Sequence, residues 1–370
     1  MSGDRLTVYL SVPLHGVSAA SARFVRSGAR RALADAGGRV GRFRIRLAVL
    51  DSTEPRDSLW DPGRVEANAE RATDDSTAIA YLGELDYGGS AVSVPVTNKA
   101  GLLQVSPGDG LASLTVRPDG LSVGPERYYP DRRRSFLRLV PSDALRARVL
   151  LEGVDEPGNR LAIVTDRGVY GRELARQLSS RASRSGLTVT GIEEFDGSPD
   201  AVHTVAQAVA AQDPEAVVYA GALEAGAVRV LGEIGDRRPA VRLIASGGFG
   251  TPRDAGFPSG SRRAVEVLAP VHPADRYPPA GRSVLREMSR DGRAARPEAL
   301  YGYQAMRLVL DAVRRAGADR SRVIRAALRP GPRRSVLGSY SVRPRGDLVG
   351  LGFTRYTVRS AGALLDVLSP

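Results

Sequence analysis

Two stretches of the chain, far apart in sequence, carry nearly the same order of apolar and polar positions. Residues 78–108 and 216–248 each predict a buried strand, an acidic loop, a helix, a second apolar strand and a glycine-ended turn. The first residues correspond in the pairs Tyr81 and Tyr219, Gly83 and Gly221, Leu85 and Leu223, and Asp86 and Glu224. A strand–helix unit used twice predicts two similar α/β lobes, each with a parallel sheet flanked by helices.

The first lobe is predicted as strands and helices in alternation. In order along the chain, the pattern predicts a strand over 6–12, a helix over 19–36, a strand over 43–51, a helix over 61–75, a strand over 78–85 and a helix from Ser90. Strand, helix and parallel strand form the unit that closes right-handed. Residues 107–135, rich in Gly, Pro, Asp and Arg, predict an irregular segment.

The same plan restarts after a strand-like segment at 136–143. In order, the pattern predicts a helix from Ser142 or Asp143 to about Gly153, a strand over 160–166, a helix over 172–185, a strand over 187–195, a helix over 199–212, a strand over 216–221, a helix, and a strand over 242–248. The helical segment 283–328 has no strands of its own, so we expect it to return and cover the first lobe. The end of the chain, 338–362, alternates like a hairpin with Gly346 near its turn.

A chain of 370 residues exceeds what one hydrophobic core usually organises, so two domains are expected. We expect a first lobe made of 1–139 and 270–338, and a second lobe made of 140–269 and 339–370. Repeated crossing between the lobes would build a multi-stranded hinge. Two facing lobes would make a cleft lined by the loops that follow their strands.

Composition narrows the class of protein. The chain has no cysteine, which excludes disulfides, thiolate metal sites and cysteine nucleophiles. No apolar run reaches the length of a membrane span, and the start lacks the features of a secretory signal. We therefore expect either a cytoplasmic protein or an exported one whose signal is absent from this sequence.

The formal net charge of +12 raises the question of nucleic acid binding. Nearly all cations are arginines, with Lys99 the single lysine, and they are dispersed apart from a run at Arg132, Arg133 and Arg134. A nucleic-acid-binding protein concentrates its cations on one face, with aromatic or helix-turn-helix context, and aromatics here make up only 5%. A solvated basic surface is the better interpretation, and no nucleic acid partner is expected.

The patterns of common catalytic and metal sites are missing from the sequence. His15, His203 and His272 lie in unrelated settings, without a ligand partner at metal spacing. There is no nucleophile elbow, phosphate-binding loop or assignable pair of catalytic carboxylates. Glycines at 37–41 and 247–250 lack dinucleotide spacing and predict turns. We expect neither an enzyme nor a metal or cofactor.

Several loop residues suit a small polar ligand instead. Ser90 lies where a helix begins, and the free N–H groups and positive dipole end of a helix N-terminus suit a carboxylate, with plain helix capping as the equal alternative. Ser106 could add a hydroxyl or serve only in its turn. Tyr170 could cover a ligand or pack on the hinge. Asp86 and Glu224 could receive an ammonium group or simply be solvated.

At these residues the sequence resembles the branched-chain amino-acid-binding proteins of ABC transporters, which are type I periplasmic binding proteins. The likeness covers nearly the whole chain and runs through "PLHG", "GARRALADAGGRVG", "LGELDYGGSAVSVPVTNKAGLLQVSPG", "FLRLVPSD", "TDRGVYGRELA" and "YGYQAM". It implies a Venus-flytrap receptor with two Rossmann-like lobes joined by a three-crossing hinge, monomeric and without catalysis. It also implies an extracytoplasmic protein that binds a solute between its lobes and delivers it to a membrane permease.

The resemblance also implies a ligand site. The loop from Tyr87 to Ser90 and the turn from Ser106 to Gly108 would bind the ligand's carboxylate, Tyr170 would stack over the ligand, and Leu223 and Gly247 would contribute from the second lobe.

Two positions depart from the family. Gly110 stands where a threonine is common, and Gly247 stands where amino-acid binders place an acid for the ammonium group. Either Asp86, Asp109 or Glu224 takes that role, or the ligand is an amide, a carboxylate or another less cationic solute.

Other functions are compatible with the same sequence. A ligand-sensing regulatory protein or a detached receptor domain can use this fold. An enzyme on a two-lobed α/β frame is disfavoured, because no His, Cys or Lys chemistry converges. A fused DNA-binding head is disfavoured, because the first strand begins at about Leu6.

Overall fold

The structure is a computed structural model of the chain. It describes residues 4–54, 60–122, 124–154, 156, 158–223, 225–250, 252, 264–290, 295–359 and 363–368. The chain forms two compact units. Unit 1 comprises Met1–Val116, Val123–Pro141 and Val271–Gly352, and unit 2 comprises Arg117–Ser122, Ser142–Pro270 and Phe353–Pro370.

Unit 1 is built on a six-stranded sheet in the order β2-β3-β1-β4-β5-β6. Its strands are β1 (Arg5–Val12), β2 (Arg39–Val40), β3 (Phe43–Asp51), β4 (Ala78–Leu82), β5 (Leu103–Ser106) and β6 (Phe136–Arg138). Neighbouring strands are parallel except for the short β2, which runs antiparallel to β3. β4 is buried along its whole length, as expected for a strand covered on both faces.

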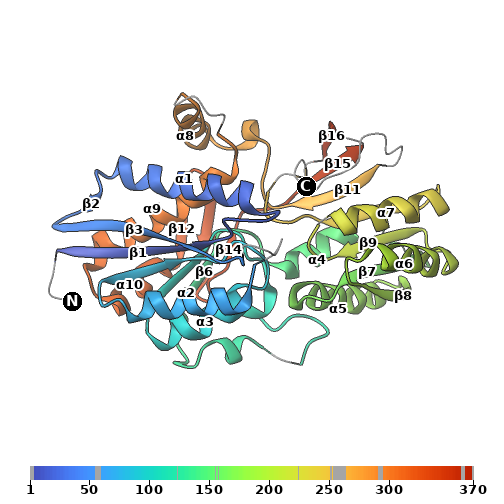
Figure 1. The fold of residues 1–370 in the computed structure, drawn as a ribbon, viewed down its shortest axis with the longest axis horizontal. Helices are drawn as coiled ribbons and strands as arrows, with labels where there is room; N and C mark the ends of the chain where they lie inside the picture. Colours follow the sequence, from blue (N-terminus) through green and yellow to red (C-terminus); the bar gives the residue numbers. More distant parts are fainter. Residues whose placement is uncertain are drawn as a thin grey trace. The chain divides into compact units, whose positions relative to one another are not determined.

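Helices cover both faces of this sheet. The connecting elements are α1 (Ala19–Asp35), α2 (Pro62–Asp74), α3 (Ser90–Lys99) and the short 3-10 helices η1 (Ala112–Leu114) and η2 (Pro125–Tyr128). α2 packs Ala69 and Ala72 against Tyr9 and Tyr81 of the sheet. Within unit 1, Figure 1 shows α1 on the other side of the sheet from α2 and α3. The irregular segment predicted over 107–135 is confirmed, with only the two 3-10 turns inside it.

The helices near the end of the chain belong to unit 1, as predicted from their lack of strands. They are α8 (Pro279–Ser289), preceded by the 3-10 turn η4 (Ala274–Arg276), α9 (Glu298–Ala316) and α10 (Arg320–Ala327). α9 packs directly on α1: a Cβ on Gly28 would lie 1.8 Å from Ala299 O, and one on Gly302 would lie 1.9 Å from Val25 O. Because the two backbones touch there, only glycine fits at both positions.

A small antiparallel sheet of β12 (Gly331–Ser335), β13 (Gly338–Val342) and β14 (Leu348–Val349) also belongs to unit 1. β13 and β14 form a hairpin with Gly346 in its turn, as predicted. Because β13 pairs on both sides with strands of unit 1, residues 339–352 lie in unit 1 rather than in the second lobe, where the sequence analysis placed them.

Unit 2 is built on a seven-stranded sheet in the order β16-β15-β11-β10-β9-β7-β8. Its strands are β7 (Arg160–Asp166), β8 (Thr188–Phe195), β9 (Ala216–Ala220), β10 (Arg242–Ser246), β11 (Val265–Ala269), β15 (Thr354–Arg359) and β16 (Ala363–Leu368). The strands β7 to β11 pair in parallel, and β15 and β16 continue the sheet in antiparallel order.

The helices of unit 2 are α4 (Asp143–Leu151), α5 (Val169–Arg184), α6 (Pro199–Ala211) and α7 (Ala225–Arg237). α6 and α7 pack over Tyr219 and Leu243 in one apolar cluster, and within unit 2 Figure 1 shows α5 on the other side of the sheet from α7. α5 begins three residues earlier than predicted, at Val169, because the extended Gly168 serves as its N-cap. Tyr170 therefore lies in the first turn of a helix and not in a loop.

The parallel strands of the two units share one topology. Unit 1 has the order β3-β1-β4-β5-β6 and unit 2 has the order β8-β7-β9-β10-β11. In chain order both are second, first, third, fourth and fifth, which confirms the internal repeat predicted from the sequence. The order reverses between β1 and β4 and between β7 and β9, and ligands of open α/β sheets bind beside the carboxyl ends of such strands.

Candidate ligand-binding site

A hydrogen bond links the two switch-point loops of unit 1, which follow β1 and β4. The Ser18 hydroxyl donates to Asp86 Oδ1 at 2.6 Å. Asp86 is half-buried. Shielding of its carboxyl group from water raises the pKa of Asp86 to about 6, although the Ser18 bond acts in the opposite direction. At neutral pH Asp86 is therefore an ionised acceptor that is partly open to solvent.

Glu84 bonds the loop after β4 to side chains of the strands β1 and β4. The residue is 2% exposed, and its carboxyl oxygens accept hydrogen bonds from the Tyr81 hydroxyl at 2.6 Å and the Ser11 hydroxyl at 2.8 Å. Burial raises the pKa of Glu84 to about 8. The carboxyl group thus keeps its proton in most molecules at neutral pH, which lowers the cost of placing an acid in the interior.

Ser90 and Ser106 both bond to the protein itself. Ser90 Oγ accepts from the Glu84 N–H at 3.2 Å. Ser106 Oγ donates to Glu84 O at 2.7 Å and accepts from the N–H groups of Asp109 at 2.8 Å and Gly108 at 3.2 Å. Both serines are fully buried. The Ser106 hydroxyl joins the loop after β4 to the turn after β5, and the Ser90 hydroxyl closes the loop after β4 on itself.

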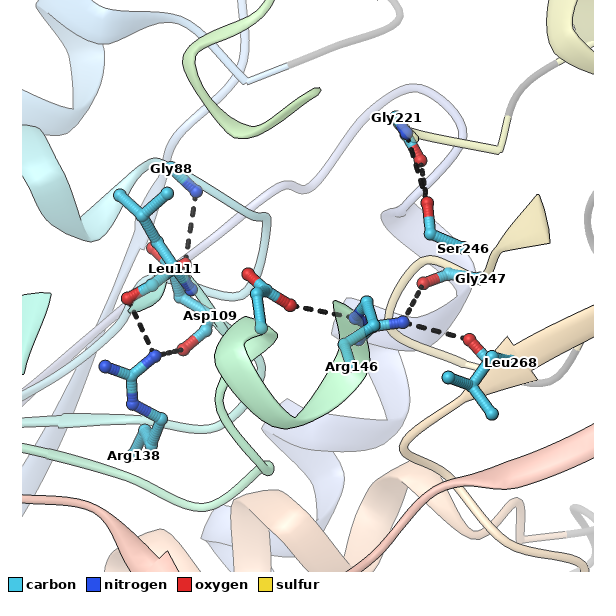
Figure 2. Close-up of polar contacts among 10 residues, drawn as sticks. Gly88, Asp109, Leu111, Arg138, Arg146, Gly221, Ser246, Gly247 and Leu268 are labelled. Carbon is cyan, nitrogen blue, oxygen red and sulfur yellow. Dashed lines mark hydrogen bonds and ion pairs between the residues drawn. The ribbon is translucent and has the colours of Figure 1, made fainter. Parts of the chain in front are cut away.

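The carboxylate of Asp109, from the turn after β5, lies at the start of α3. Its Oδ1 accepts from the N–H groups of Gly88 at 3.1 Å and Leu111 at 3.0 Å, and its Oδ2 accepts from the Ser90 N–H at 2.8 Å. Figure 2 shows the carboxylate between Gly88 and Leu111. Asp109 is fully buried, and burial raises its pKa while these N–H donors favour the ionised form.

Arg138 holds the same turn from the adjacent strand. Its guanidinium donates to Leu111 O at 2.8 Å and to the Thr115 hydroxyl oxygen at 2.8 Å, and it lies 3.1 Å from the Asp347 carboxylate. The side chain is fully buried. Figure 2 shows its guanidinium directed at Leu111. A buried arginine bonded to carbonyl and carboxylate oxygens fixes the turn that carries Asp109.

In unit 2 the corresponding loops are joined by Asp166, at the carboxyl end of β7. Its Oδ2 accepts from the Ala222 N–H in the loop after β9 at 2.7 Å, and its Oδ1 accepts from the Gly168 N–H at 2.8 Å. Ser246 adds a second link, because its Oγ accepts from the Gly221 N–H at 3.1 Å and donates to Gly221 O at 2.8 Å (Figure 2). Asp166 is half-buried, and burial raises its pKa.

A second buried arginine, Arg146, lies under the loop after β10. Its Nε donates to Asp143 at 2.8 Å, and its Nη1 donates to Gly247 O at 3.1 Å and Leu268 O at 2.9 Å (Figure 2). A Cβ on Gly247 would lie 2.8 Å from Leu268 O and 3.0 Å from the Val267 side chain. The backbone therefore has no room for an acidic side chain at this position.

Comparison with known proteins gives these loops a context. The family model described as periplasmic binding protein matches residues 7–350. The chain belongs to the periplasmic binding protein family. An amino acid binding protein of Pseudomonas aeruginosa is 22% identical over 340 residues, which cover 91% of this chain and 85% of that protein.

Solved structures of periplasmic binding proteins agree with the fold. The leucine-binding protein LivK of Thermotoga maritima superposes with a TM-score of 0.80 at 16% identity, covering 99% of both chains. An ABC transporter solute-binding protein of R. palustris in complex with benzoate superposes with a TM-score of 0.75 at 14% identity, covering 99% of this chain and 97% of that one. The resemblance and the two-lobed type I fold predicted from the sequence are confirmed.

Periplasmic binding proteins are solute-binding proteins and not enzymes, and members of the family are extracytoplasmic. This chain is accordingly a solute-binding protein. Within the described ranges, no group of three or more His, Asp or Glu side chains is arranged to hold a metal ion. A search of the same residues for a helix long and apolar enough to cross a membrane finds none.

The structure places the predicted ligand residues of this periplasmic binding protein in two groups. In unit 1, Asp86, Tyr87, Ser90, Ser106 and Gly108 lie in the loop after β4 and the turn after β5, which the hydrogen bonds above join together. Tyr87 is 8% exposed. The fully buried hydroxyls of Ser90 and Ser106 bond to the backbone of these loops. The N-cap of α3 is Gly89, and no side chain caps the helix, so the hydroxyl of Ser90 holds the loop after β4 and does not cap α3.

In unit 2, Tyr170 is buried in the first turn of α5, with 4% of its surface exposed. Leu223 is partly buried and packs against the apolar cluster under α6 and α7. Gly247 follows β10, and its carbonyl is bonded to Arg146. Glu224, the predicted counterpart of Asp86, lies outside the described residues.

The sequence analysis missed the side chains that hold these loops. Asp109 was considered only as a partner for an ammonium group, which its full burial prevents, and Glu84, Asp166 and the two arginines were not considered. One signal was available: Arg138 interrupts an apolar strand segment, and a charged residue in such a setting indicates a buried ion pair.

Proposed function

We propose that this periplasmic binding protein captures a small polar solute with the switch-point loops of both units and delivers it to the permease of an ABC importer outside the cytoplasm. The observation that supports this most directly is the tethering of those loops in each unit. Ser18 bonds to Asp86 in unit 1, and Ala222 bonds to Asp166 in unit 2. Loops fixed in advance lose little conformational entropy when a ligand binds.

The relatives suggest the size of the solute. LivK is a leucine-binding protein, and the R. palustris protein was solved with benzoate. Both ligands are small molecules with one polar head and an apolar body. We propose a ligand of this size for the present chain, from the amino acids and the related amides and carboxylates.

The proposed mechanism is closure by a hinge. The ligand docks on one unit and then favours the closed state, because only there do both units contact it. Micromolar affinity corresponds to about −8 kcal/mol, from which any cost of closure is subtracted. We propose that Asp86, Tyr87 and Gly108 contribute from unit 1 and that Tyr170, Leu223, Glu224 and Gly247 contribute from unit 2, with Ser90 and Ser106 holding the unit 1 loop.

A thermal-shift screen tests this function. Amino acids, their amides, small carboxylates and aromatic acids are added one at a time to the purified chain, and a compound that binds the folded state raises the melting temperature. Calorimetry then gives the affinity of each hit. If no compound of these classes changes the melting temperature, the proposed solute class is wrong.

Tyr170→Ala tests the unit 2 contribution. With a hit in hand, we expect this variant to bind at least about tenfold more weakly, as measured by calorimetry, because a large aromatic contact surface is lost. Val169→Ala is the matched control, because Val169 is the neighbouring residue of α5 and is 50% exposed. Equal affinity of the two variants would remove Tyr170 from the site.

A further inference from the structure

The start of α3 has the electrostatic character of an anion site. The first N–H groups of a helix have no partner within the helix, and its N-terminus carries a partial positive charge. The N–H of Ser90, the first residue of α3, is a donor of this kind, and the N–H of Gly88, which precedes the N-cap Gly89, bonds to the same carboxylate. A ligand carboxylate at the switch point of unit 1 would need them.

Those donors are already used by a carboxylate of the protein. Asp109 Oδ2 takes the Ser90 N–H, and Oδ1 takes the N–H groups of Gly88 and Leu111. The carboxylate is fully buried, so it is not exchanged for a ligand group by a small side-chain rotation. Its own backbone is held as well, because the Asp109 N–H donates to Ser106 Oγ at 2.8 Å.

The charges around the loop also disfavour a ligand carboxylate at this place. Asp86 is the acid of this loop that is partly open to solvent. Its pKa is raised by shielding from water and, in addition, by the charge of Asp109. The buried cation behind the turn, Arg138, directs its guanidinium to Leu111 O, Thr115 and Asp347. The loop therefore offers a half-buried acceptor, Asp86, while the N–H groups of Gly88 and Ser90 are occupied by Asp109.

We propose that Asp109 is a specificity-determining residue, which fills the amide donors at the start of α3 so that the ligand presents a neutral or cationic hydrogen-bond donor, and not a carboxylate, to the loop after β4. This inference rests on the proposed function, since it assigns the chemistry of one end of the solute. An amide N–H, an ammonium or a similar group donates a hydrogen bond to Asp86. An anion at the same place faces the Asp86 carboxylate and finds the nearby N–H donors already bonded to Asp109.

Acetate rescue tests the inference without the natural ligand. Asp109→Ala vacates the donors of Gly88, Ser90 and Leu111 and leaves Arg138 behind them, which creates a site for a small carboxylate. We expect about 0.1 M sodium acetate to raise the melting temperature of this variant by about 2–4 °C relative to the same concentration of sodium chloride. The wild type should show no such difference.

Asp75→Ala is the matched control. Asp75 also accepts hydrogen bonds in unit 1, from the Thr77 N–H at 2.8 Å and the Tyr9 hydroxyl at 2.9 Å. It precedes β4, so it lies at the amino end of that strand, away from the loops after β1 and β4. Acetate should leave this variant unchanged. An acetate effect of equal size on the wild type or on Asp75→Ala would overturn the proposal, as would the absence of an effect on Asp109→Ala. Asp109→Ser serves in the same assay if the alanine variant does not fold.

Paired probes test the wild type directly. Isocaproate, which has the side chain of leucine without its amino group, is compared with isocaproamide, and benzoate with benzamide, by calorimetry on the full chain, because each of these compounds has a single polar group. The inference expects the amide of each pair to bind at least as tightly as the acid, or the acid not to bind. Tight binding of an acid that is lost on amidation would overturn it. If no compound in the wider screen binds the wild type but acetate still rescues Asp109→Ala, the proposed solute class fails while the role of Asp109 stands.

Discussion

The loop after β4 in unit 1 and its counterpart after β9 in unit 2 begin alike and are held differently. In both, a strand tyrosine crowds the first glycine: a Cβ on Gly83 would lie 3.0 Å from Tyr81 Cε1, and one on Gly221 would lie 3.0 Å from Tyr219 Cε1. After that the two loops diverge, because the unit 1 loop is bonded to an acid from the turn after β5 and the unit 2 loop to an acid at the end of β7.

The two acids differ in their access to water. Asp109 is fully buried, whereas Asp166 is half-buried, although each accepts from three backbone N–H groups: Gly88, Ser90 and Leu111 bond to Asp109, and Gly168, Gly171 and Ala222 bond to Asp166. Each unit also has one fully buried arginine on its loop carbonyls, Arg138 in unit 1 and Arg146 in unit 2. A shared topology thus determines where the loops lie, while single side chains determine which donors and acceptors remain for a ligand.

The largest effect is expected from Arg138→Met. Removal of the guanidinium leaves Asp347, Leu111 O and the turn of Asp109 without their buried partner, and breaking a buried ion pair in this way costs about 3–5 kcal/mol of unfolding free energy. Urea unfolding followed by circular dichroism measures the loss. Arg133→Met is the control, because Arg133 is exposed in the preceding segment. A loss no larger than that of the control would show that Arg138 does not hold the turn.

A smaller loss is expected from Asp166→Ala. The backbone donors of Gly168, Gly171 and Ala222 lose their acceptor, and an unsatisfied donor costs about 1–3 kcal/mol where it is buried and less where water reaches it. Asp109→Ala should be the more destabilising of the pair, since its three donors are buried. Asp196→Ala is the control, because Asp196 lies on an exposed turn of unit 2, where it accepts from Ser198 and pairs with Arg167 at 3.7 Å in contact with water. Equal melting temperatures for Asp109→Ala and Asp166→Ala would contradict the contrast drawn between the two loops.

The raised pKa of Glu84 predicts that the free energy of unfolding depends on pH. Its pKa is about 8 in the folded protein against an ordinary value of 4.5, so the folded state binds more protons between these values. Stability should therefore fall as the pH rises from about 5 to about 8, by up to about 1.4 kcal/mol for each pH unit in that window. The hydroxyls of Tyr81, Ser11 and Ser93 and the charge of Asp109 act on this carboxyl.

Glu84→Gln should remove that part of the slope, since an amide does not titrate. Melting temperatures at pH 5, 6.5 and 8 (about these values) measure the slope in each protein. Glu66→Gln, at an exposed position of α2, should keep the wild-type slope. A wild-type slope that survives in Glu84→Gln would place the proton uptake elsewhere.

The smallest effect is expected from Ser18→Ala. The variant loses one hydrogen bond to Asp86, worth about 0.5–1.5 kcal/mol. Because that bond favours the ionised form, the pKa of Asp86 should rise above its value of about 6. A carbon-detected NMR titration of the Asp86 carboxyl measures the shift. Ser27→Ala on the same helix, where the hydroxyl bonds only to Arg23 O, should leave the titration unchanged.

The sequence predicted the fold well because the fold depends on periodicity. Alternation and buried runs located the strands, and the repeat of 78–108 in 216–248 located the two switch points. The site was predicted less completely. Ser90 was identified from its place at a helix start, but the position of Asp109 over the same N–H groups follows from the path of the turn after β5, which no local pattern encodes.

The boundaries that failed did so for similar reasons. Residues 339–352 were assigned to the second lobe because strand partners are tertiary and the alternation of a hairpin does not name the sheet it belongs to. Tyr170 was placed in a loop because Gly168 was taken as part of a longer turn and not as a helix N-cap.

The contact of α9 with α1 has a consequence for synthesis. Gly302 meets Val25, and Gly28 meets Ala299, so the first helix of the chain finds its partner only after some three hundred residues have been made. Most of unit 2, by contrast, comes from one continuous stretch, Ser142–Pro270. During translation the amino-terminal part of unit 1 therefore stays incompletely folded and exposed to aggregation, while the central part of the chain can already fold.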